Sequence, residues 1–299
     1  MKAIKLTNKN RINFISLMFF GPALLLYFIF TIIPATVSLL ASFTDWDGVS
    51  KNFNIIGIAN FIEIFTGERF INAVKNTSLI TIFSVVFVNI LALILAILLD
   101  NVTKGKSLFR SIFFVPQVLS AIIVSYMWAY MLNYDSGIFN VFLNGIGLGS
   151  LTQDWLGDPR FALISFTLIL IWQGVGFYMI IYLATLQTIP GELIEASRID
   201  GAGPIRQFKD ITLPLIAPAI TTCVILSIIG ALNVYDMVIA LTNGGPGFST
   251  ETIVVTMLFE ATRTSRQGVA SAEAIILFIA TMVISIVITG YLRKKEVDY

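Results

Sequence analysis

Six long apolar segments constrain the fold of this chain more than any other feature of its sequence. They are residues 14–42, 77–99, 111–132, 161–186, 215–241 and 270–291. Each is long enough for a helix to cross the hydrocarbon core of a bilayer, which takes about 20 residues. Backbone N–H and C=O groups find no water in lipid, so each segment must pair them internally as a helix. With 57% hydrophobic and 12% charged residues among 299, the chain is predicted to be an all-α integral membrane protein with about six transmembrane helices.

The distribution of lysine and arginine predicts the orientation of these helices, because cationic loops are retained in the cytoplasm. With both termini and the second and fourth loops inside, the cytoplasmic side holds 13 of the 19 basic residues. We therefore expect both termini to be cytoplasmic. The first apolar segment is too long for a signal peptide and lacks a clear cleavage site, so it is expected to remain as a span.

Several function classes find no support in the composition. The chain has no histidine and one cysteine, Cys223, within the fifth apolar segment. Disulfides, zinc clusters and histidine proton relays are therefore not expected, and no metal site is predicted. A net charge of +1 without a clustered basic face gives no reason to expect nucleic acid as a partner. No nucleophile–base pair is visible, so the chain is not expected to be an enzyme.

The longest polar stretch between two apolar segments, residues 189–218, reads as helix, turn and helix. Pro190 suits the start of a helix, and Asp200-Gly201 can end it. Gly203-Pro204 opens a second short helix. The apolar side of this element needs a partner; its residues are Leu193, Ala196, Ile205 and Phe208.

This stretch resembles the "EAA" loop in membrane subunits of ATP-driven importers. The matching residues are Glu195, Ala196, Ser197, Gly201, Ile211, Leu213 and Pro214, and the fuller string, which includes Asp200 and Ala202, is similar to that of maltose-type (MalF-like) sugar permeases. The resemblance implies the transmembrane domain of a type I ABC importer, with these nine residues forming a cytoplasmic loop that couples to an ATPase. It also implies a location in the cell (inner) membrane of a bacterium or archaeon.

The chain itself carries no ATPase motif. Gly105-Lys106-Ser107 lacks the glycine that a phosphate-binding loop has five residues earlier, where Asp100 stands instead. ATP and magnesium are therefore expected to bind to partner subunits, and no cofactor is expected in this chain. The resemblance implies a second, MalG-like permease subunit, two ATP-binding subunits and an extracytoplasmic sugar-binding protein, with membrane lipid around the helices. The outer loops at residues 133–159 and 243–268 are expected to meet the binding protein.

Alignment on the family's motifs places a set of residues near its sugar-contacting positions. They are Gln117, Gln173, Gly174, Phe177, Ser227, Gly230 and Asn233. Polar groups beside an aromatic ring suit a sugar, whose hydroxyls need partners and whose C–H face stacks on rings. Gln117 and Phe177 stand where the maltose-type subunit has tyrosine, and Ala231 and Val234 replace asparagines. For each residue alone, helix packing is an alternative role. These departures put maltose itself in doubt or move recognition to the partner subunit.

The resulting hypothesis is a permease subunit of an ATP-driven, binding-protein-dependent importer of di- or oligosaccharides. The alternative is a stand-alone secondary transporter of small polar solutes, which calls for mid-membrane ionisable residues and internal symmetry. Three regions are expected: residues 1–71 with the N-terminal tail, first span and external loop; residues 72–290 as the transport domain; and residues 291–299 as a cytoplasmic tail.

Overall fold

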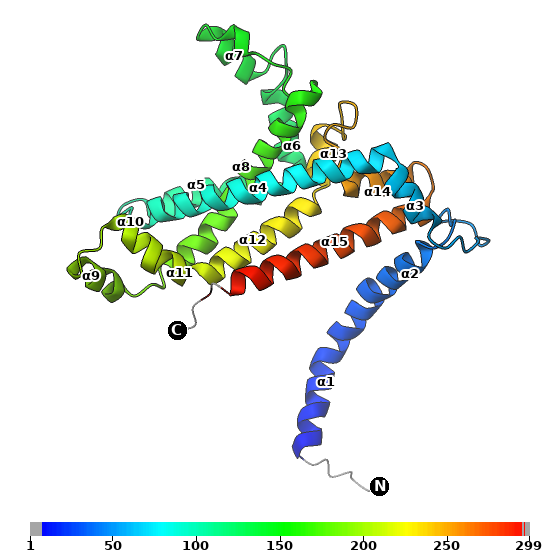
Figure 1. The fold of residues 1–299 in the computed structure, drawn as a ribbon, viewed down its shortest axis with the longest axis horizontal. Coiled ribbons are helices and arrows are strands. Elements are labelled where there is room, and N and C mark those ends of the chain that lie inside the picture. Colours follow the sequence, from blue (N-terminus) through cyan, green and yellow to red (C-terminus); the bar gives the residue numbers. More distant parts are fainter. Residues whose placement is uncertain (1–7, 295, 297–299) are drawn as a thin grey trace. The chain divides into compact units, whose positions relative to one another are not determined.

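The computed structural model describes residues 8–294 and residue 296, with side chains from Met18 onward. Within them the regular structure is helical, apart from one isolated bridge between Thr44 and Ile55. The chain divides into two compact units, Met1–Ile64 with Phe259–Ile275 and Phe65–Leu258 with Ile276–Tyr299. Figure 1 shows the course of the chain through these helices.

The helices follow one another in three groups along the chain. The first group is α1 (Asn8–Tyr27), the π-helix η1 (Phe28–Ile32), α2 (Ile33–Ala41) and α3 (Ala59–Thr66). The second is α4 (Glu68–Asp100), α5 (Lys106–Val118), α6 (Ala121–Met131), α7 (Ile138–Gly145), the 3-10 helix η2 (Gly149–Leu151) and α8 (Pro159–Leu186). The third is α9 (Gly191–Ile199), α10 (Pro204–Gln207), the π-helix η3 (Phe208–Thr212), α11 (Leu213–Leu215), α12 (Ala217–Leu232), α13 (Asp236–Leu241), α14 (Ile253–Thr262) and α15 (Gln267–Arg293).

Among the described residues, four stretches are long and apolar enough to cross a membrane as continuous helices. They are Met18–Ala41, Glu68–Asp100, Pro159–Leu186 and Gln267–Arg293. Two further candidates are pairs of helices bent at a short break: α5 with α6 at 96°, and Pro204–Leu215 with α12 at 68°. If each bent pair is one span, the structure has the six spans that the sequence predicts.

The third and fifth apolar segments are therefore not the single helices that the sequence suggested. The chain turns at Leu119 and Ser120 between α5 and α6, and the fifth segment is interrupted again between α12 and α13. Pro34 in the first span and Pro214 in the fifth each follow a π-helix. Proline cannot donate the hydrogen bond to the carbonyl four residues earlier, which explains why regular α-helix is disturbed there.

The larger unit is built around α4 and α8, which pack together along much of their length. Small residues of α4, such as Ala92 and Ala96, are fully buried in this interface together with Met179 and Tyr182 of α8. Small side chains let helix backbones approach closely, which is what stabilises helix pairs in lipid. The helix α12 packs against both α4 and α8, and α5 packs against α8 (Figure 1).

The smaller unit has the short α3 attached to the chain that follows α2. The side-chain amide of Asn60 donates to the carbonyls of Ser42 (2.9 Å) and Thr44 (2.8 Å), and the backbone N–H of Gly268 donates to the carbonyl of Trp46 (2.9 Å). Arg266 pairs with Glu63 at 2.5 Å. Asp47 and Ser50 lie in the segment between α2 and α3. Hydrogen bonds from the hydroxyl and backbone N–H of Ser50 lower the pKa of Asp47 to about 2.

The segment at residues 133–159, which was expected to be an outer loop, has regular structure of its own. It contains α7 and η2, and the helix α7 ends at Gly145. The side chain of Asn140, which is buried, donates to the carbonyls of Tyr134 and Gln153 and accepts from the indole of Trp155 at 2.8 Å. A single buried amide therefore organises this segment, which composition alone did not reveal.

Candidate functional site

Two groups of residues were predicted to carry function, and the first lies in the stretch between α8 and α12. The helix α9 ends at Ile199, and Gly201 has a φ of +78° in the turn that follows. That backbone conformation suits glycine, because a Cβ would crowd the neighbouring carbonyl. The prediction that the chain breaks at Asp200-Gly201 and restarts at Pro204 is confirmed.

Hydrogen bonds within this turn fix its shape. The N–H of Ala202 donates to the carbonyl of Ser197 at 2.9 Å, and the side-chain amide of Gln207 donates to the carbonyl of Ala202 at 2.9 Å. The hydroxyl of Ser197, a buried residue, donates to the carbonyl of Ile194 at 2.7 Å. The two short helices are thus joined by a defined elbow.

The predicted coupling residues are spread along this elbow. Glu195, Ala196, Asp200 and Gly201 are exposed and Ala202 is half-buried, whereas Ile211 of η3 and Leu213 and Pro214 of α11 are partly buried at the start of the bent fifth span. Two isoleucines near the turn are almost fully exposed: Ile199 at 88% and Ile205 at 84%. These two exposed aliphatic side chains lie on the element for which the sequence predicts a partner.

The second group surrounds a cavity of about 480 Å³ in the larger unit. Six of the seven residues predicted for the substrate path line it: Gln117, Gln173, Gly174, Phe177, Ser227 and Gly230. They come from α5, α8 and α12, with Ser84 and Val88 of α4 completing the wall. The volume lies within the range of ligand sites, roughly 300–1,000 Å³.

The broken span contributes directly to this cavity. Leu119, at the bend between α5 and α6, is part of the lining, and its carbonyl accepts a hydrogen bond from the side-chain amide of Gln173 at 3.2 Å. Leu119 is followed by the N-cap of α6 and cannot use its carbonyl as it would inside a continuous helix. The bend therefore exposes a backbone acceptor beside the predicted path residues.

Asn233 does not belong to this lining. It follows α12 as its C-cap, is exposed, and donates to the carbonyl of Ile229 one turn earlier at 2.8 Å. A residue that closes the end of a helix in this way has a local role. The structure thus separates Asn233 from the other six predicted path residues.

A chain of side-chain hydrogen bonds lies behind Ser227, and the sequence analysis did not single it out. The hydroxyl of Tyr182 donates to the amide oxygen of Asn89 at 2.7 Å, and the amide nitrogen of Asn89 donates to the hydroxyl oxygen of Ser227 at 3.0 Å. Ser227 in turn donates to the carbonyl of Val224 at 2.9 Å. The only sequence signal was one asparagine within an apolar segment, which costs free energy in lipid unless it is paired.

The hydrogen-bonding capacity of Ser227 follows from these contacts. Its single proton is donated to Val224, and one of its two lone pairs accepts from Asn89. One lone pair remains for a molecule in the cavity. Ser227 is therefore arranged as an acceptor for a hydroxyl or N–H donor.

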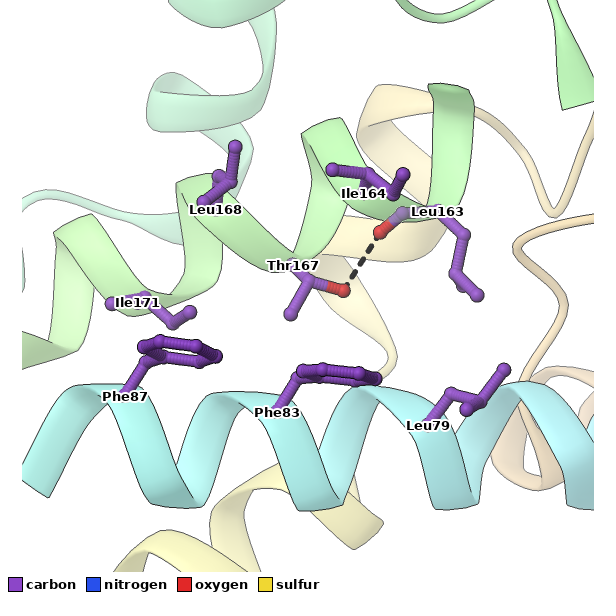
Figure 2. Close-up of a pocket in the computed structure, with 8 residues that line it drawn as sticks. All are labelled: Leu79, Phe83, Phe87, Leu163, Ile164, Thr167, Leu168 and Ile171. Atoms are coloured by element: carbon purple, nitrogen blue, oxygen red, sulfur yellow. Dashed lines mark hydrogen bonds between the residues drawn. The ribbon is translucent and has the colours of Figure 1, made fainter. Parts of the chain in front are cut away.

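A second cavity, of about 400 Å³, is lined by apolar side chains of α4 and α8. Figure 2 shows the rings of Phe83 and Phe87, which lie nearly parallel, below Leu163, Leu168 and Ile171. The lining also includes Thr167, but its hydroxyl donates to the carbonyl of Leu163 at 2.7 Å (Figure 2). This cavity offers no free donor to a polar solute, which favours the first cavity as the solute site.

Comparison with known proteins assigns the family. Residues 89–296 match the model of the binding-protein-dependent transport system inner membrane component. A probable ABC transporter permease protein, YurN of Bacillus subtilis, is 34% identical over 283 residues, covering 94% of this chain and 96% of its own. The multiple sugar-binding transport system permease protein MsmF of Streptococcus mutans is 34% identical over 274 residues, covering 92% and 93%.

A solved structure supports the same assignment at the level of the fold. The bacterial ABC transporter that imports the acidic polysaccharide alginate contains a chain that matches with a TM-score of 0.84 and 25% identity, covering 95% of this chain and 96% of that one. The helical fold described above is therefore that of a known ABC importer subunit. This chain belongs to the family of inner membrane components of binding-protein-dependent transport systems, the non-catalytic permease subunits of ABC importers.

Proposed function

We propose that this permease subunit forms half of the translocation pathway of an importer of di- or oligosaccharides. The observation that carries this proposal is the cavity of about 480 Å³, in which amides, a hydroxyl and aromatic rings meet. Gln117 and Gln173 offer both donors and acceptors, Ser227 offers an acceptor, and Phe177 and Tyr178 offer ring faces. This mixture suits a sugar, which presents many hydroxyls on an apolar C–H frame.

The relatives support a carbohydrate as the solute. MsmF is named for multiple sugars and the matched solved transporter imports alginate. The cavity itself contains no charged side chain. An uncharged sugar therefore fits this cavity better than an acidic polysaccharide such as alginate.

We further propose that residues 189–218 couple this subunit to a cytoplasmic ATPase. The nine coupling residues are Glu195, Ala196, Ser197, Asp200, Gly201, Ala202, Ile211, Leu213 and Pro214. The elbow leads through η3 and α11 directly into α12, which lines the cavity. The elbow is therefore connected along the chain to the cavity wall, through a bend of 68° before α12.

The assembly proposed around this chain contains a second permease subunit and two ATP-binding subunits, besides the solute-binding protein on which the family depends. Both termini and the elbow lie in the cytoplasm, and residues 133–159 and 243–268 lie outside, where they meet the binding protein. ATP moves the cavity between inward-facing and outward-facing states only if it binds these states with different affinities. In this proposal the transport domain comprises residues 72–290, and residues 1–71 and 291–299 are not part of that domain.

Uptake of radiolabelled di- and oligosaccharides by the complete importer tests the solute and its site. Gln117→Leu and Phe177→Ala are each expected to lower ATP-dependent uptake about tenfold, the effect of one lost hydrogen bond or ring contact. Val283→Ala, which truncates an exposed side chain of α15, is expected to leave uptake unchanged. If both cavity variants transport every sugar at the normal rate, the cavity is not the sugar path.

A further inference from the structure

The turn between α13 and α14 presents an aromatic side chain in an unusual backbone conformation. Phe248 has a φ of +64°, and its side chain remains 52% exposed. A positive φ is rare for a bulky residue, because its Cβ crowds the backbone, and glycine would occupy this position without strain. Such strain persists where the surrounding structure fixes it, and it is concentrated at functional positions.

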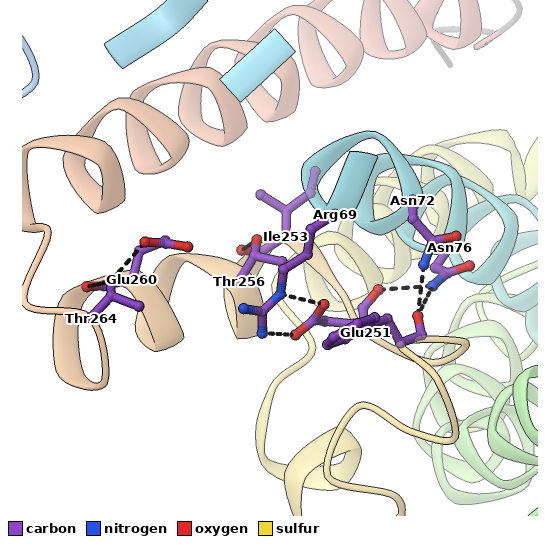
Figure 3. Close-up of polar contacts among 9 residues, drawn as sticks. Arg69, Asn72, Asn76, Glu251, Ile253, Thr256, Glu260 and Thr264 are labelled. Atoms are coloured by element: carbon purple, nitrogen blue, oxygen red, sulfur yellow. Dashed lines mark hydrogen bonds and ion pairs between the residues drawn. The ribbon is translucent and has the colours of Figure 1, made fainter. Parts of the chain in front are cut away.

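The first turns of α4 hold Phe248 in this conformation. The side-chain amide of Asn72 donates to the carbonyl of Phe248 at 2.7 Å. One turn later the amide of Asn76 donates to the same carbonyl at 3.0 Å and to the carbonyl of Glu251 at 3.1 Å. Figure 3 shows the two asparagines reaching from one face of α4 toward the turn. The backbone of the turn is therefore fixed by two side chains more than 170 residues earlier in the sequence.

An ion pair closes the same cluster. The guanidinium of Arg69 forms two hydrogen bonds with the carboxylate of Glu251, at 2.9 and 2.5 Å (Figure 3). It also lies 5.0 Å from the centre of the Phe248 ring. Only 3% of the Glu251 side chain is exposed. The Arg69 side chain is 28% exposed, so the pair is partly buried, and its two hydrogen bonds impose a specific geometry. Arg69 thus fixes both the base of the turn and the ring at its tip.

The exposed part of the turn carries no charge of its own. Residues 243–250 read Asn-Gly-Gly-Pro-Gly-Phe-Ser-Thr, and the nearest acidic group, Glu251, is neutralised by Arg69. A rigid, exposed aromatic side chain on an uncharged support has the features of an anchor residue in a protein interface. Joining two helices does not by itself require such a residue.

We propose that Phe248 is the anchor through which this permease engages its solute-binding protein, and that Arg69, Asn72, Asn76 and Glu251 are positioning residues that hold it ready. The partner surface is an apolar pocket without charge. The proposal rests on the external orientation of residues 243–268 given under Proposed function. It assigns to one residue a contact that the outer segments as a whole were expected to make.

Accessibility labelling tests the contact and the orientation separately. The only natural cysteine, Cys223, is buried, so the wild-type chain serves as the blank. With Phe248→Cys, a membrane-impermeant maleimide added to spheroplasts is expected to label residue 248, and the binding protein loaded with a transported sugar is expected to protect it. The binding protein is added well above the roughly tenfold higher concentration that a truncated anchor is expected to need, and labelling that remains unchanged there overturns the anchor. Labelling only in inside-out vesicles overturns the orientation, and with it the function proposed for this loop.

A second measurement separates docking from folding. In Phe248→Gly the strained φ is relieved, so the purified importer is expected to be at least as heat-stable as the wild type. The concentration of binding protein that half-maximally stimulates ATP hydrolysis is nevertheless expected to rise about tenfold, the typical loss for a truncated anchor residue. Phe248→Tyr is expected to behave as the wild type. An unchanged half-maximal concentration in Phe248→Gly contradicts the proposal.

The positioning residues are tested in the same assay. Glu251→Gln keeps the size of the side chain but removes the charge that orients Arg69, so it is expected to raise the half-maximal concentration while leaving the maximal rate of hydrolysis unchanged. Asp100→Asn is the matched control, because it removes the more exposed ion pair with Lys106 at the other end of α4. It is expected to leave the half-maximal concentration of binding protein unchanged. A lower maximal rate at an unchanged half-maximal concentration would mean that Glu251 acts on folding or coupling and not on docking.

Discussion

Two glycines of α8, only two positions apart, have different surroundings. A Cβ on Gly176 would overlap the backbone carbonyl of Phe113 in α5. A Cβ on Gly174 would make ordinary contacts, 3.6 Å from the ring of Tyr178 and 3.7 Å from the side chain of Val88. The sequence left open whether such glycines serve packing or leave space for a ligand. The structure assigns packing to Gly176 and a place on the cavity wall to Gly174.

Gly176→Ala is expected to destabilise the permease by about 1–3 kcal/mol, because the backbones of α5 and α8 must separate to admit the methyl group. Gly174→Ala is expected to leave stability nearly unchanged, since its methyl group fits. Thermal unfolding of both purified variants in the same detergent checks this contrast. Equal unfolding temperatures for the two variants would contradict the close approach of α5 to Gly176.

Tyr182 is expected to matter through its hydroxyl group. Tyr182→Phe keeps the buried ring, which is only 1% exposed, but leaves the amide oxygen of Asn89 without its donor. An unpaired buried acceptor costs about 1–3 kcal/mol, so the unfolding temperature should fall. Tyr130→Phe, at a position that is 79% exposed, is the matched control and should not change it. If the unfolding temperature of Tyr182→Phe equals that of the wild type, the amide oxygen of Asn89 finds another donor.

At the scale of elements, the breaks in the helices create the features that a transporter needs. The bend between α5 and α6 brings Gln117 and the carbonyl of Leu119 to the cavity. The elbow between α9 and α10 depends on Gly201, whose φ of +78° ends one helix before the next begins. Straight helices would leave neither an exposed backbone acceptor nor a protruding elbow.

Gly201→Ala is expected to strain the elbow by about 1 kcal/mol, because a side chain disfavours the left-handed conformation. The importer should remain in the membrane while ATP-driven uptake falls about fivefold, the change that corresponds to that free energy. Gly191→Ala, in the same stretch, is the control: its φ is not positive and a Cβ there meets nothing within 4 Å. Uptake that is equally reduced in both variants would argue against a special role for the turn.

At the scale of the whole molecule, the chain is one subunit of an ABC importer. Ile199 at 88% and Ile205 at 84% are the exposed isoleucines of the elbow, and in the proposed assembly they face the ATPase subunit. Single apolar residues on a surface are common, and two beside one turn offer an apolar contact to such a partner.

Ile199→Asp combined with Ile205→Asp is expected to weaken binding of the ATPase subunits at least about tenfold, because carboxylates would have to be desolvated in an apolar contact. Copurification of the ATPase subunits with a tagged permease measures this. Ile138→Asp changes an exposed isoleucine of α7 and should leave copurification intact. Full retention of the ATPase by the double variant would place its contact elsewhere.

Much of this molecule follows from local sequence. Runs of apolar residues determine where helices cross the membrane, because the cost of unpaired backbone groups in lipid leaves no alternative. The elbow is also predictable from local sequence, since Gly201 and Pro204 fix the backbone by their own conformational preferences. For these reasons the four continuous candidate spans and the break at Asp200-Gly201 were predictable.

Other features depend on contacts between residues far apart in the chain. Hydropathy does not report the direction of the backbone, so the bend at Leu119 and the second break near Asn233 were hidden within continuous apolar runs. The hydrogen bonds of Asn89 reach residues 93 and 138 positions away, and those of Asn72 and Asn76 reach more than 170. A polar side chain in a span must find a partner, but its sequence neighbours do not identify which one. The sequence determined the membrane-crossing helices and the elbow, whereas packing in three dimensions decided which polar groups meet, because only there is each buried donor assigned its acceptor.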